Sequence, residues 1–237
     1  RNKSSRPFLW EMGYKIVGGK VVNIEAVIFD LDGVIVTTDD YHYEAWKKIA
    51  DQENIYFDRE INERLRGVSR MESLDIILEK SSKIYNEEEK IELATRKNDY
   101  YKNLLENLTK EDILPGILET LNFLENKKIK TAIGSSSKNT IFILNKIGLI
   151  DKFDAIVDGT MIKNSKPAPE VFLQAAEKVG IKAEKCLVVE DADAGVEAGK
   201  RAGMRVLGVG SAKNNENADY KSENMEEFNI ASIFLKR

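Results

Sequence analysis

The stretch EAVIFDLDGVIVTTDDYHYEAW (residues 25–46) joins an apolar run to two aspartates and then to a helical pattern. A β-strand repeats every two residues, so Asp30 and Asp32, which follow the run AVIF, leave the strand on the same side. Two carboxylates held this close repel each other. Either both are solvated turn residues, or a positive group belongs beside them.

The bulk composition is that of an ordinary globular protein. The chain has 237 residues, of which 42% are hydrophobic and 32% charged, so it has ample material for a core. Its length fits one large domain or one domain with a smaller companion. The net charge of −4 gives no electrostatic reason to expect nucleic acid or an anionic membrane as a partner.

Cysteine usage and hydropathy predict a cytoplasmic protein. Cys186 is the only cysteine, so no internal disulfide can form and a reducing compartment is expected. No apolar run reaches the roughly 18 residues of a membrane span. Residues 1–24 form an extension without the apolar core of a secretion signal, and we assign it no role. Its segment YKIVGGKVVN is either a hairpin turning at Gly18-Gly19 or an upstream remnant.

From Glu25 onward, short apolar runs alternate with helical patterns. This alternation favours a Rossmann-like parallel α/β sheet with helices on both faces. The expected strands are 26–29, 129–135, 155–158, 186–191 and 205–210, and the expected helices are 115–125, 139–147, 170–179 and 194–202. The active site of such a sheet lies beyond the carboxyl ends of its strands. Asp30, Ser135 and Glu190 stand at such ends.

Between Asp40 and Leu108 the alternation stops and only helical patterns follow. In YHYEAWKKIADQEN, one helix face collects His42, Ala45, Trp46, Ile49 and Ala50. We therefore expect an inserted helical cap at 39–108, with the α/β core formed by 25–38 and 109–237.

Four short stretches at expected strand ends carry the polar residues. They are DLDG (30–33), GSSSKN (134–139), SKPAPEVF (165–172) and VVEDADAG (188–195). The hydroxyls and free N–H groups of the second suit an anion. The third places Lys166 before two prolines that fix the chain ahead of a helix.

If these ends converge, four carboxylates meet in one pocket: those of Asp30, Asp32, Glu190 and Asp191. At about 4 Å and an effective dielectric near 20, each pair costs about 4 kcal/mol, which one lysine cannot offset. Carboxylates and a backbone carbonyl are the hard oxygen ligands that magnesium takes. The sequence predicts Mg²⁺ together with Lys166, and a phosphate to complete the coordination.

In chain order, DLDGVI, the Ser135 stretch, Lys166 and the ED pair at 190–191 resemble the four motifs of the haloacid-dehalogenase-like phosphotransferases. The resemblance runs from about Glu25 to Gly210. The stretches YHYEAW, LRGVSRMES and RKNDYY further resemble the cap of the sugar-phosphate mutases in that superfamily. The resemblance implies a Mg²⁺-dependent, monomeric isomerase of small sugar phosphates, without nucleic-acid or membrane partners.

The resemblance also implies roles for core residues. Asp30 is the nucleophile that becomes an aspartyl phosphate. Asp32 is the general acid/base, and its main-chain carbonyl binds the metal together with Asp30, Glu190 and Asp191. The residues implied to surround the transferring phosphoryl group are Ser135, Ser136, Ser137, Lys138, Asn139 and Lys166.

For the cap, the resemblance implies that Arg70 binds the non-transferring phosphate and that His42 and Lys97 orient Asp32 and the sugar. The residues implied to line the sugar side are Trp46, Leu65, Gly67, Val68 and Ser69. Plainer alternatives are a buried structural His42, an ion-pair partner role for Arg70, a solvated Lys97, and a Trp46 that only packs the cap core.

The chain departs from the family pattern at two positions. Thr37 stands where many relatives carry an aspartate beside the cap hinge, which leaves the rate of cap motion open. Ser136 replaces a small apolar residue. Two other functions stay open: a sugar-phosphate phosphatase, in which water takes the phosphoryl group, and a catalytically idle binding protein, against which the intact motifs weigh.

Overall fold

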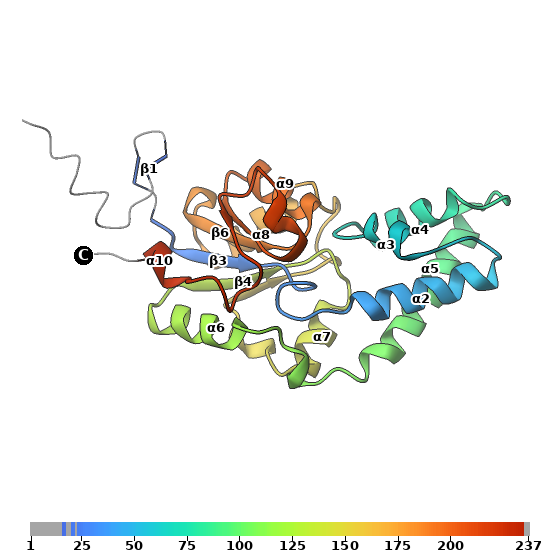
Figure 1. Cartoon of the computed structure of the whole chain (residues 1–237), viewed down its shortest axis with the longest axis horizontal. Coiled ribbons are helices and arrows are strands. Elements are labelled where there is room, and N and C mark those ends of the chain that lie inside the picture. Colours follow the sequence, from blue (N-terminus) through green and yellow to red (C-terminus); the bar gives the residue numbers. More distant parts are fainter. Residues whose placement is uncertain (1–15, 18–19, 22, 235–237) are drawn as a thin grey trace, which may run out of the picture.

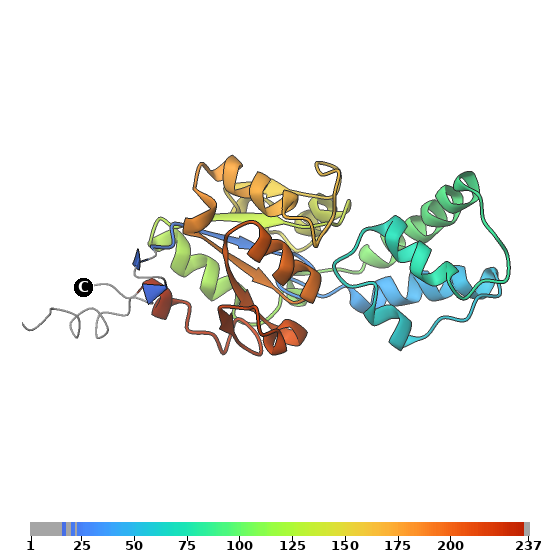
Figure 2. The ribbon, with the colours of Figure 1, turned by 90° about the horizontal axis from the view of Figure 1, so that it is seen from above.

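The computed structural model describes residues 16–17, 20–21 and 23–234. Figure 1 shows an α/β part that holds the sheet and a separate group of helices beside one end of it. The view from above in Figure 2 shows the same division. The predicted Rossmann-like parallel sheet with an inserted helical cap is therefore confirmed.

The sheet is parallel and has the strand order β5-β4-β3-β6-β7-β8. Its strands are β3 (Ala26–Phe29), β4 (Lys130–Gly134), β5 (Ala155–Val157), β6 (Cys186–Glu190), β7 (Arg205–Gly208) and β8 (Tyr220–Lys221). Phe29 lies opposite Ile133 of β4 and Val189 of β6, so these three central strands end together. The first five strands match the predicted ones. The sixth falls in the tail after Gly210, where we predicted no element.

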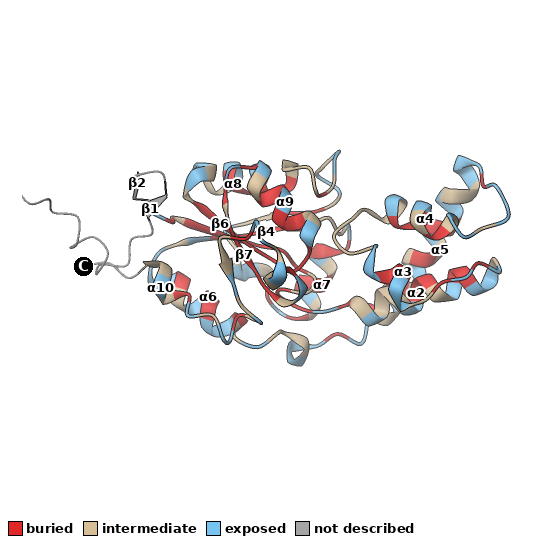
Figure 3. Ribbon diagram, turned by 45° about the horizontal axis from the view of Figure 1, so that its top comes forward, coloured by how far each residue is buried: buried red, intermediate tan, exposed pale blue. Residues whose placement is uncertain are grey.

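Helices cover both faces of the sheet, which is why its central strands are apolar throughout. Helices α6 (Ile117–Asn126) and α7 (Thr140–Lys146) pack on one face, and α8 (Glu170–Val179) and α9 (Asp193–Arg201) on the other. All four residues of β3 are fully buried. Figure 3 shows the strands as the most buried part of the fold.

The cap consists of four helices placed after the first strand of the core. They are α2 (Asp39–Gln52), α3 (Arg59–Glu63), α4 (Arg70–Leu78) and α5 (Glu87–Leu105). They share a core of their own that includes Trp46, Ile49 and Leu74. Trp46 is 2% exposed, so it packs in the cap core, as the plainer of its two expected roles requires.

The remaining elements are short. The predicted N-terminal hairpin is present as β1 (Ile16–Val17) paired antiparallel with β2 (Lys20–Val21), while the turn at 18–19 lies outside the described residues. The others are η1 (Lys110–Asp112), η2 (Ile150–Lys152), η3 (Ala183–Lys185), η4 (Gly210–Asn214) and α10 (Ala231–Phe234). None of the described helices is both long and apolar enough for a membrane span. Cys186 is fully buried in β6.

Candidate active site

A cavity of about 950 Å³ lies between the carboxyl ends of the strands and the cap. Its lining contains three of the predicted core carboxylates, from Asp30, Asp32 and Asp191. It also contains every residue predicted to contact substrate: His42, Trp46, Leu65, Gly67, Val68, Ser69, Arg70, Lys97, Ser135, Ser136, Ser137, Lys138, Asn139 and Lys166. Glu190 is not part of this lining; its side chain is fully buried and accepts a hydrogen bond from Lys166, which lines the cavity.

Two glycines allow the carboxylates to approach the backbone. Gly33, at φ +81°, sits so close to Asp191 that a Cβ at this position would lie 2.1 Å from Asp191 Oδ2. A Cβ at Gly195 would lie 1.8 Å from Glu190 Oε2. A side chain at either position would displace a carboxylate, so the glycines of DLDG and VVEDADAG are required by the site geometry.

Lys166 joins two of the carboxylates from below the cavity. Its Nζ donates to Asp30 Oδ1 at 2.6 Å and to Glu190 Oε2 at 2.8 Å, and its side chain is 1% exposed. Burial alone lowers the pKa of Lys166, but the charges of Asp30 and Glu190 outweigh burial and raise it. The lysine therefore stays protonated.

The buried carboxylates form a site that fits a hard divalent cation. Oxygens of Asp30, Glu190 and Asp191 lie within 4.8 Å of one another. Burial and the neighbouring charge of Asp30 raise the pKa of Glu190 to about 7, and burial and the charge of Glu190 raise the pKa of Asp191 well above its ordinary value. A metal ion stabilises the ionised form of carboxylates whose pKa is raised for these reasons, and oxygen ligands of this kind suit Mg²⁺.

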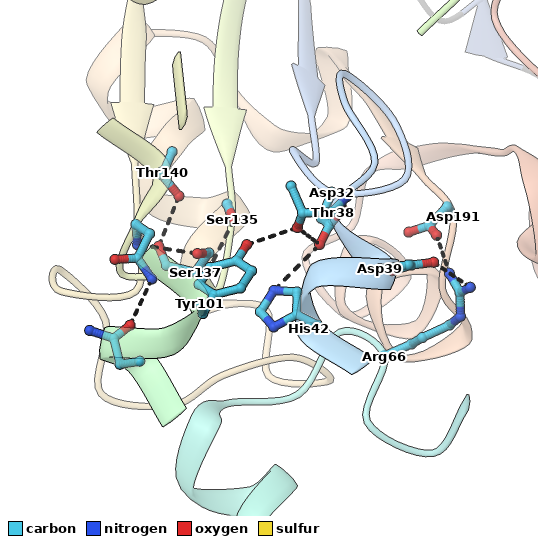
Figure 4. Close-up of polar contacts among 12 residues, drawn as sticks. Asp32, Thr38, Asp39, His42, Arg66, Tyr101, Ser135, Ser137, Thr140 and Asp191 are labelled. Carbon is cyan, nitrogen blue, oxygen red and sulfur yellow. Dashed lines mark hydrogen bonds and ion pairs between the residues drawn. The ribbon is translucent and has the colours of Figure 1, made fainter. Parts of the chain in front are cut away.

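Asp32 is held on both oxygens by the residue that precedes the cap. The backbone N–H of Thr38 donates to Asp32 Oδ1 at 2.6 Å, and the Thr38 hydroxyl lies 2.6 Å from Asp32 Oδ2. Burial, followed by the charge of Asp39, raises the pKa of Asp32 to about 7 against the lowering effect of these hydrogen bonds. Figure 4 shows Asp32 facing Thr38 and His42.

The cap reaches Asp32 through two of its predicted partners. His42 Nε2 lies 3.5 Å from Asp32 Oδ2, and His42 Nδ1 lies 2.7 Å from Lys97 Nζ. Lys97 is only 2% exposed, so the alternative of a solvated lysine is wrong. Burial and the charge of Lys97 hold the pKa of His42 well below its ordinary value, and burial and the charge of Arg70 do the same for Lys97.

Two arginines lie in the same cap region with different partners. Arg70 lines the cavity and, among the described residues, no carboxylate lies within ion-pair distance of it. Arg66 instead pairs with Asp39, with Glu63 at 2.8 Å and with Asp191 at 3.2 Å. Of these two arginines, Arg70 is therefore the one free to meet an anion in the cavity. The ion-pair role considered for Arg70 belongs to Arg66, which the sequence analysis did not single out.

The loop after β4 presents hydroxyl groups to the cavity. The Ser135 hydroxyl oxygen accepts the N–H of Ser137 at 3.1 Å, and the Ser137 hydroxyl oxygen accepts the N–H of Asn139 at 3.1 Å. Both hydroxyls keep their own proton for another acceptor. The Ser136 hydroxyl oxygen is buried without a hydrogen-bond partner among the described residues.

Sequence reasoning missed several contacts that join cap and core. Besides Arg66 with Asp191, Ser165 donates to Glu72 at 2.7 Å and Asn139 donates to Asn98 at 3.0 Å. These partners are 41 to 125 positions apart. Only Glu72 carries a local signal, a capping box with Ser69 at the start of α4, and that signal concerns the helix rather than the site.

Comparison with known proteins defines the class of this molecule. The chain matches the profile of the haloacid dehalogenase-like hydrolases over residues 24–203 and belongs to this family. It is an enzyme of that family with a phosphotransferase site, and its buried cluster of Asp30, Glu190 and Asp191 is one that could hold a metal ion.

Within the family, the chain is similar to β-phosphoglucomutases. It is 48% identical over 192 residues to the β-phosphoglucomutase of Bacillus subtilis (strain 168), covering 80% of this chain and 85% of that protein. The crystal structure of β-phosphoglucomutase from Clostridium difficile matches with a TM-score of 0.85 and 44% identity, over 89% of this chain and 96% of that one. The chain is also 35% identical over 189 residues to a phosphorylated carbohydrates phosphatase of Thermotoga maritima, covering 78% and 85% respectively.

Proposed function

We propose that this enzyme interconverts β-D-glucose 1-phosphate and glucose 6-phosphate, through an aspartyl phosphate at Asp30 and a β-glucose 1,6-bisphosphate intermediate. The observation that carries the proposal is the connection of Asp32, through His42, to the buried Lys97 of the cap. This connection makes the geometry of the acid/base depend on the cap, as a mutase that excludes water requires. The similarity to two β-phosphoglucomutases supports the same assignment.

Phosphoryl transfer needs an in-line nucleophile and neutralisation of the phosphoryl charge. In the proposed reaction, the Asp30 carboxylate attacks the phosphorus while Lys166, which stays protonated, offsets charge on the phosphoryl oxygens. Ser135 offers its free hydroxyl proton to the same oxygens. A bound Mg²⁺, held by Asp30, the Asp32 carbonyl, Glu190 and Asp191, would supply further charge neutralisation.

Asp32 moves the proton of the sugar hydroxyl in this scheme. A group with a pKa of about 7 can act as acid or base at neutral pH, which is the range that general catalysis requires. We infer that Lys97 donates to Nδ1 of the neutral His42, so that the Nε2 proton faces Asp32. This arrangement holds Asp32 in place without taking the catalytic proton.

Arg70 is the proposed partner of the phosphate that does not react. Its guanidinium is planar and free of carboxylates within ion-pair distance among the described residues, so it can bind a phosphate through two parallel hydrogen bonds. Leu65, Gly67, Val68 and Ser69, with the edge of Trp46, are proposed to line the sugar side.

The proposal includes several finer points. Mg²⁺ is the proposed ion, and the cap boundaries are 39–108 within a core formed by 25–38 and 109–237. All proposed site residues come from one chain, which is consistent with a monomer. The single buried thiol of Cys186 is consistent with a cytoplasmic location.

The test is the identity of the product. The enzyme is incubated with Mg²⁺, β-glucose 1-phosphate and a trace of the bisphosphate, and ³¹P NMR follows glucose 6-phosphate and inorganic phosphate. We expect glucose 6-phosphate to form far faster than phosphate is released, and the α anomer to be left unchanged. Release of phosphate from many sugar phosphates at comparable rates, with no glucose 6-phosphate, would refute the proposal.

A sugar-phosphate phosphatase is the second candidate function. The observation that favours it is the similarity to the phosphorylated carbohydrates phosphatase of Thermotoga maritima. Both candidates use Asp30, Asp32 and the metal site, so the core residues do not discriminate between them. The two differ in whether water or a sugar hydroxyl takes the phosphoryl group, which the same ³¹P experiment measures.

A further inference from the structure

Tyr101, on the cap helix α5, touches every side chain that connects Asp32 to the cap. Its own side chain is 1% exposed. Its hydroxyl lies 2.8 Å from the hydroxyl of Thr38, the residue that holds both oxygens of Asp32. Its ring stacks on His42, with 4.0 Å between ring centroids and 24° between planes, and lies 4.4 Å from Lys97 Nζ.

The ionised Asp32 carboxylate sets the direction of the hydrogen bonds that join it to Thr38 and Tyr101. A hydroxyl has one proton to donate, and an ionised carboxylate only accepts. Thr38 therefore donates to Asp32 Oδ2, and the Tyr101 hydroxyl donates to Thr38. Without the Tyr101 hydroxyl, the Thr38 hydroxyl loses the only other partner it has among the described residues.

The ring of Tyr101 fixes the second partner of Asp32. The stacked geometry leaves the imidazole of His42 one plane, and in that plane its Nε2 faces Asp32. Figure 4 shows the ring of Tyr101 beside His42 while its hydroxyl points at Thr38. One cap side chain thus contacts both residues that contact the Asp32 carboxylate.

We propose that Tyr101 is a positioning residue for Asp32, acting through Thr38 by its hydroxyl and through His42 by its ring. The inference rests on the proposed acid/base role of Asp32. It gives α5 a second connection to the reacting proton besides Lys97, at the point where the chain passes from the core into the cap.

The experiment is a double-mutant cycle on isomerisation of β-glucose 1-phosphate, using Tyr101→Phe, Thr38→Val and the double variant. A hydrogen bond contributes about 0.5–1.5 kcal/mol, so we expect Tyr101→Phe to lower kcat about two- to tenfold, with KM nearly unchanged. Because the hydroxyl acts through Thr38, the double variant should be no slower than Thr38→Val alone. If the two substitutions lower kcat by factors that multiply in the double variant, or if Tyr101→Phe changes KM alone, the proposal is overturned.

Two controls separate positioning from a structural effect. Tyr100→Phe removes the neighbouring hydroxyl of the same helix, which contacts Gln52 at 3.2 Å, and should leave kcat unchanged. In a Thr38→Ser background, which keeps the hydroxyl, Tyr101→Phe should again lower kcat by the same factor. If it has no effect there, the hydroxyl of Tyr101 does not act through position 38.

A half-reaction locates the defect. Acetyl phosphate expels acetate, a leaving group that needs no proton, so rapid-quench labelling of Asp30 by acetyl phosphate should be as fast in Tyr101→Phe as in the unmodified enzyme. Slowed labelling would show that Tyr101 supports the fold of the whole site instead. If the unmodified enzyme hydrolyses sugar phosphates and makes no glucose 6-phosphate, the proposed function fails, but the same cycle measured on hydrolysis still supports or refutes the role of Tyr101.

Discussion

Arg66 Nη1 lies 3.2 Å from Asp191 Oδ2, so an arginine of the cap contacts a carboxylate of the proposed metal site. The same guanidinium is paired with Asp39 and Glu63, both from the cap. Asp191 is 10% exposed, and Figure 4 shows it beside Arg66 and Asp39. Arg66 therefore links the cap to the core through the group that a metal ion would bind.

Arg66 and a metal ion would both bind the Asp191 carboxylate, so they compete for it. We expect Arg66→Gln to bind Mg²⁺ about fivefold more tightly without substrate, on the scale of an ion pair worth about 1 kcal/mol. Isothermal titration calorimetry measures this affinity. Arg64→Gln is a matched control from the same turn, since Arg64 pairs with Glu79 within the cap at 2.8 Å. Weaker or unchanged Mg²⁺ binding in Arg66→Gln would contradict the competition.

The contrast between Arg66 and Asp30 shows what could be predicted from the sequence. Asp30 was predictable because an apolar run places it at a strand end, and parallel strands bring their carboxyl ends together. Arg66, Thr38 and Tyr101 carry no such local pattern. Arg66 meets Asp191 across 125 positions, and Tyr101 meets Thr38 across 63.

The tail after Gly210 shows the same limit in the fold. The strand β8 has two residues, Tyr220–Lys221, which is too short for an alternating or continuous apolar pattern. It forms because β7 offers a free edge, with Leu207 opposite Tyr220. Tertiary pairing, rather than local preference, places this strand in the sheet.

Replacement of the nucleophile should remove turnover and keep the fold. In Asp30→Asn, the amide oxygen can still accept from Lys166, but an amide cannot form an acyl phosphate. We expect less than about 1% of the unmodified isomerisation rate, with an unchanged circular dichroism spectrum. Residual activity above that level in a pure preparation would show that another group attacks the phosphorus.

Metal binding should stabilise the protein more at higher pH. The pKa values of Asp32 and Glu190 are about 7 in the metal-free fold and that of Asp191 is also raised, against about 4 in an unfolded chain. Between about pH 4 and 7 the folded state holds protons that the unfolded chain has released, so its free energy of unfolding falls as pH rises. A metal ion replaces those protons and offsets this loss.

Thermal melts with and without Mg²⁺ measure this effect. At 100 times Kd, a ligand adds about 2.7 kcal/mol, which corresponds to about 5–10 °C in Tm. We expect an increase of this size at about pH 8 and a much smaller one at about pH 5.5. The Asp191→Asn variant should lose most of the increase at pH 8. An equal Mg²⁺ effect at both pH values would show that these carboxylates are not where the metal binds.

Loss of Arg70 should affect only reactions in which the site binds a phosphate besides the transferring phosphoryl group, as when β-glucose 1-phosphate meets phosphorylated Asp30. A phosphate left without its charge-assisted hydrogen bonds costs about 1.5–3 kcal/mol, so Arg70→Ala should lower kcat/KM for β-glucose 1-phosphate roughly 10- to 150-fold. Hydrolysis of acetyl phosphate, which has no distal phosphate, should change little. Arg59→Ala, which removes an exposed arginine paired with Asp40, is the control. Equal losses on both substrates would show that Arg70 is structural.

The last prediction concerns the balance between isomerisation and hydrolysis. His42 and Lys97 connect the cap to Asp32, and both are needed to hold the carboxylate where a sugar hydroxyl enters. Water is small and needs no such alignment, so it can still reach the phosphorylated Asp30 when the connection is broken. His42→Ala and Lys97→Ala should therefore lower isomerisation about 100-fold or more, the scale of lost general acid/base catalysis, while slow hydrolysis persists. The ratio of glucose 6-phosphate to inorganic phosphate, followed by ³¹P NMR, measures the shift. Lys90→Ala is the control: Lys90 lies on α5, the helix of Lys97, and pairs with Asp75 at the cap surface, so its loss should leave the ratio unchanged. If His42→Ala and Lys97→Ala slow both reactions equally, the connection to the cap supports Asp32 without selecting the sugar over water.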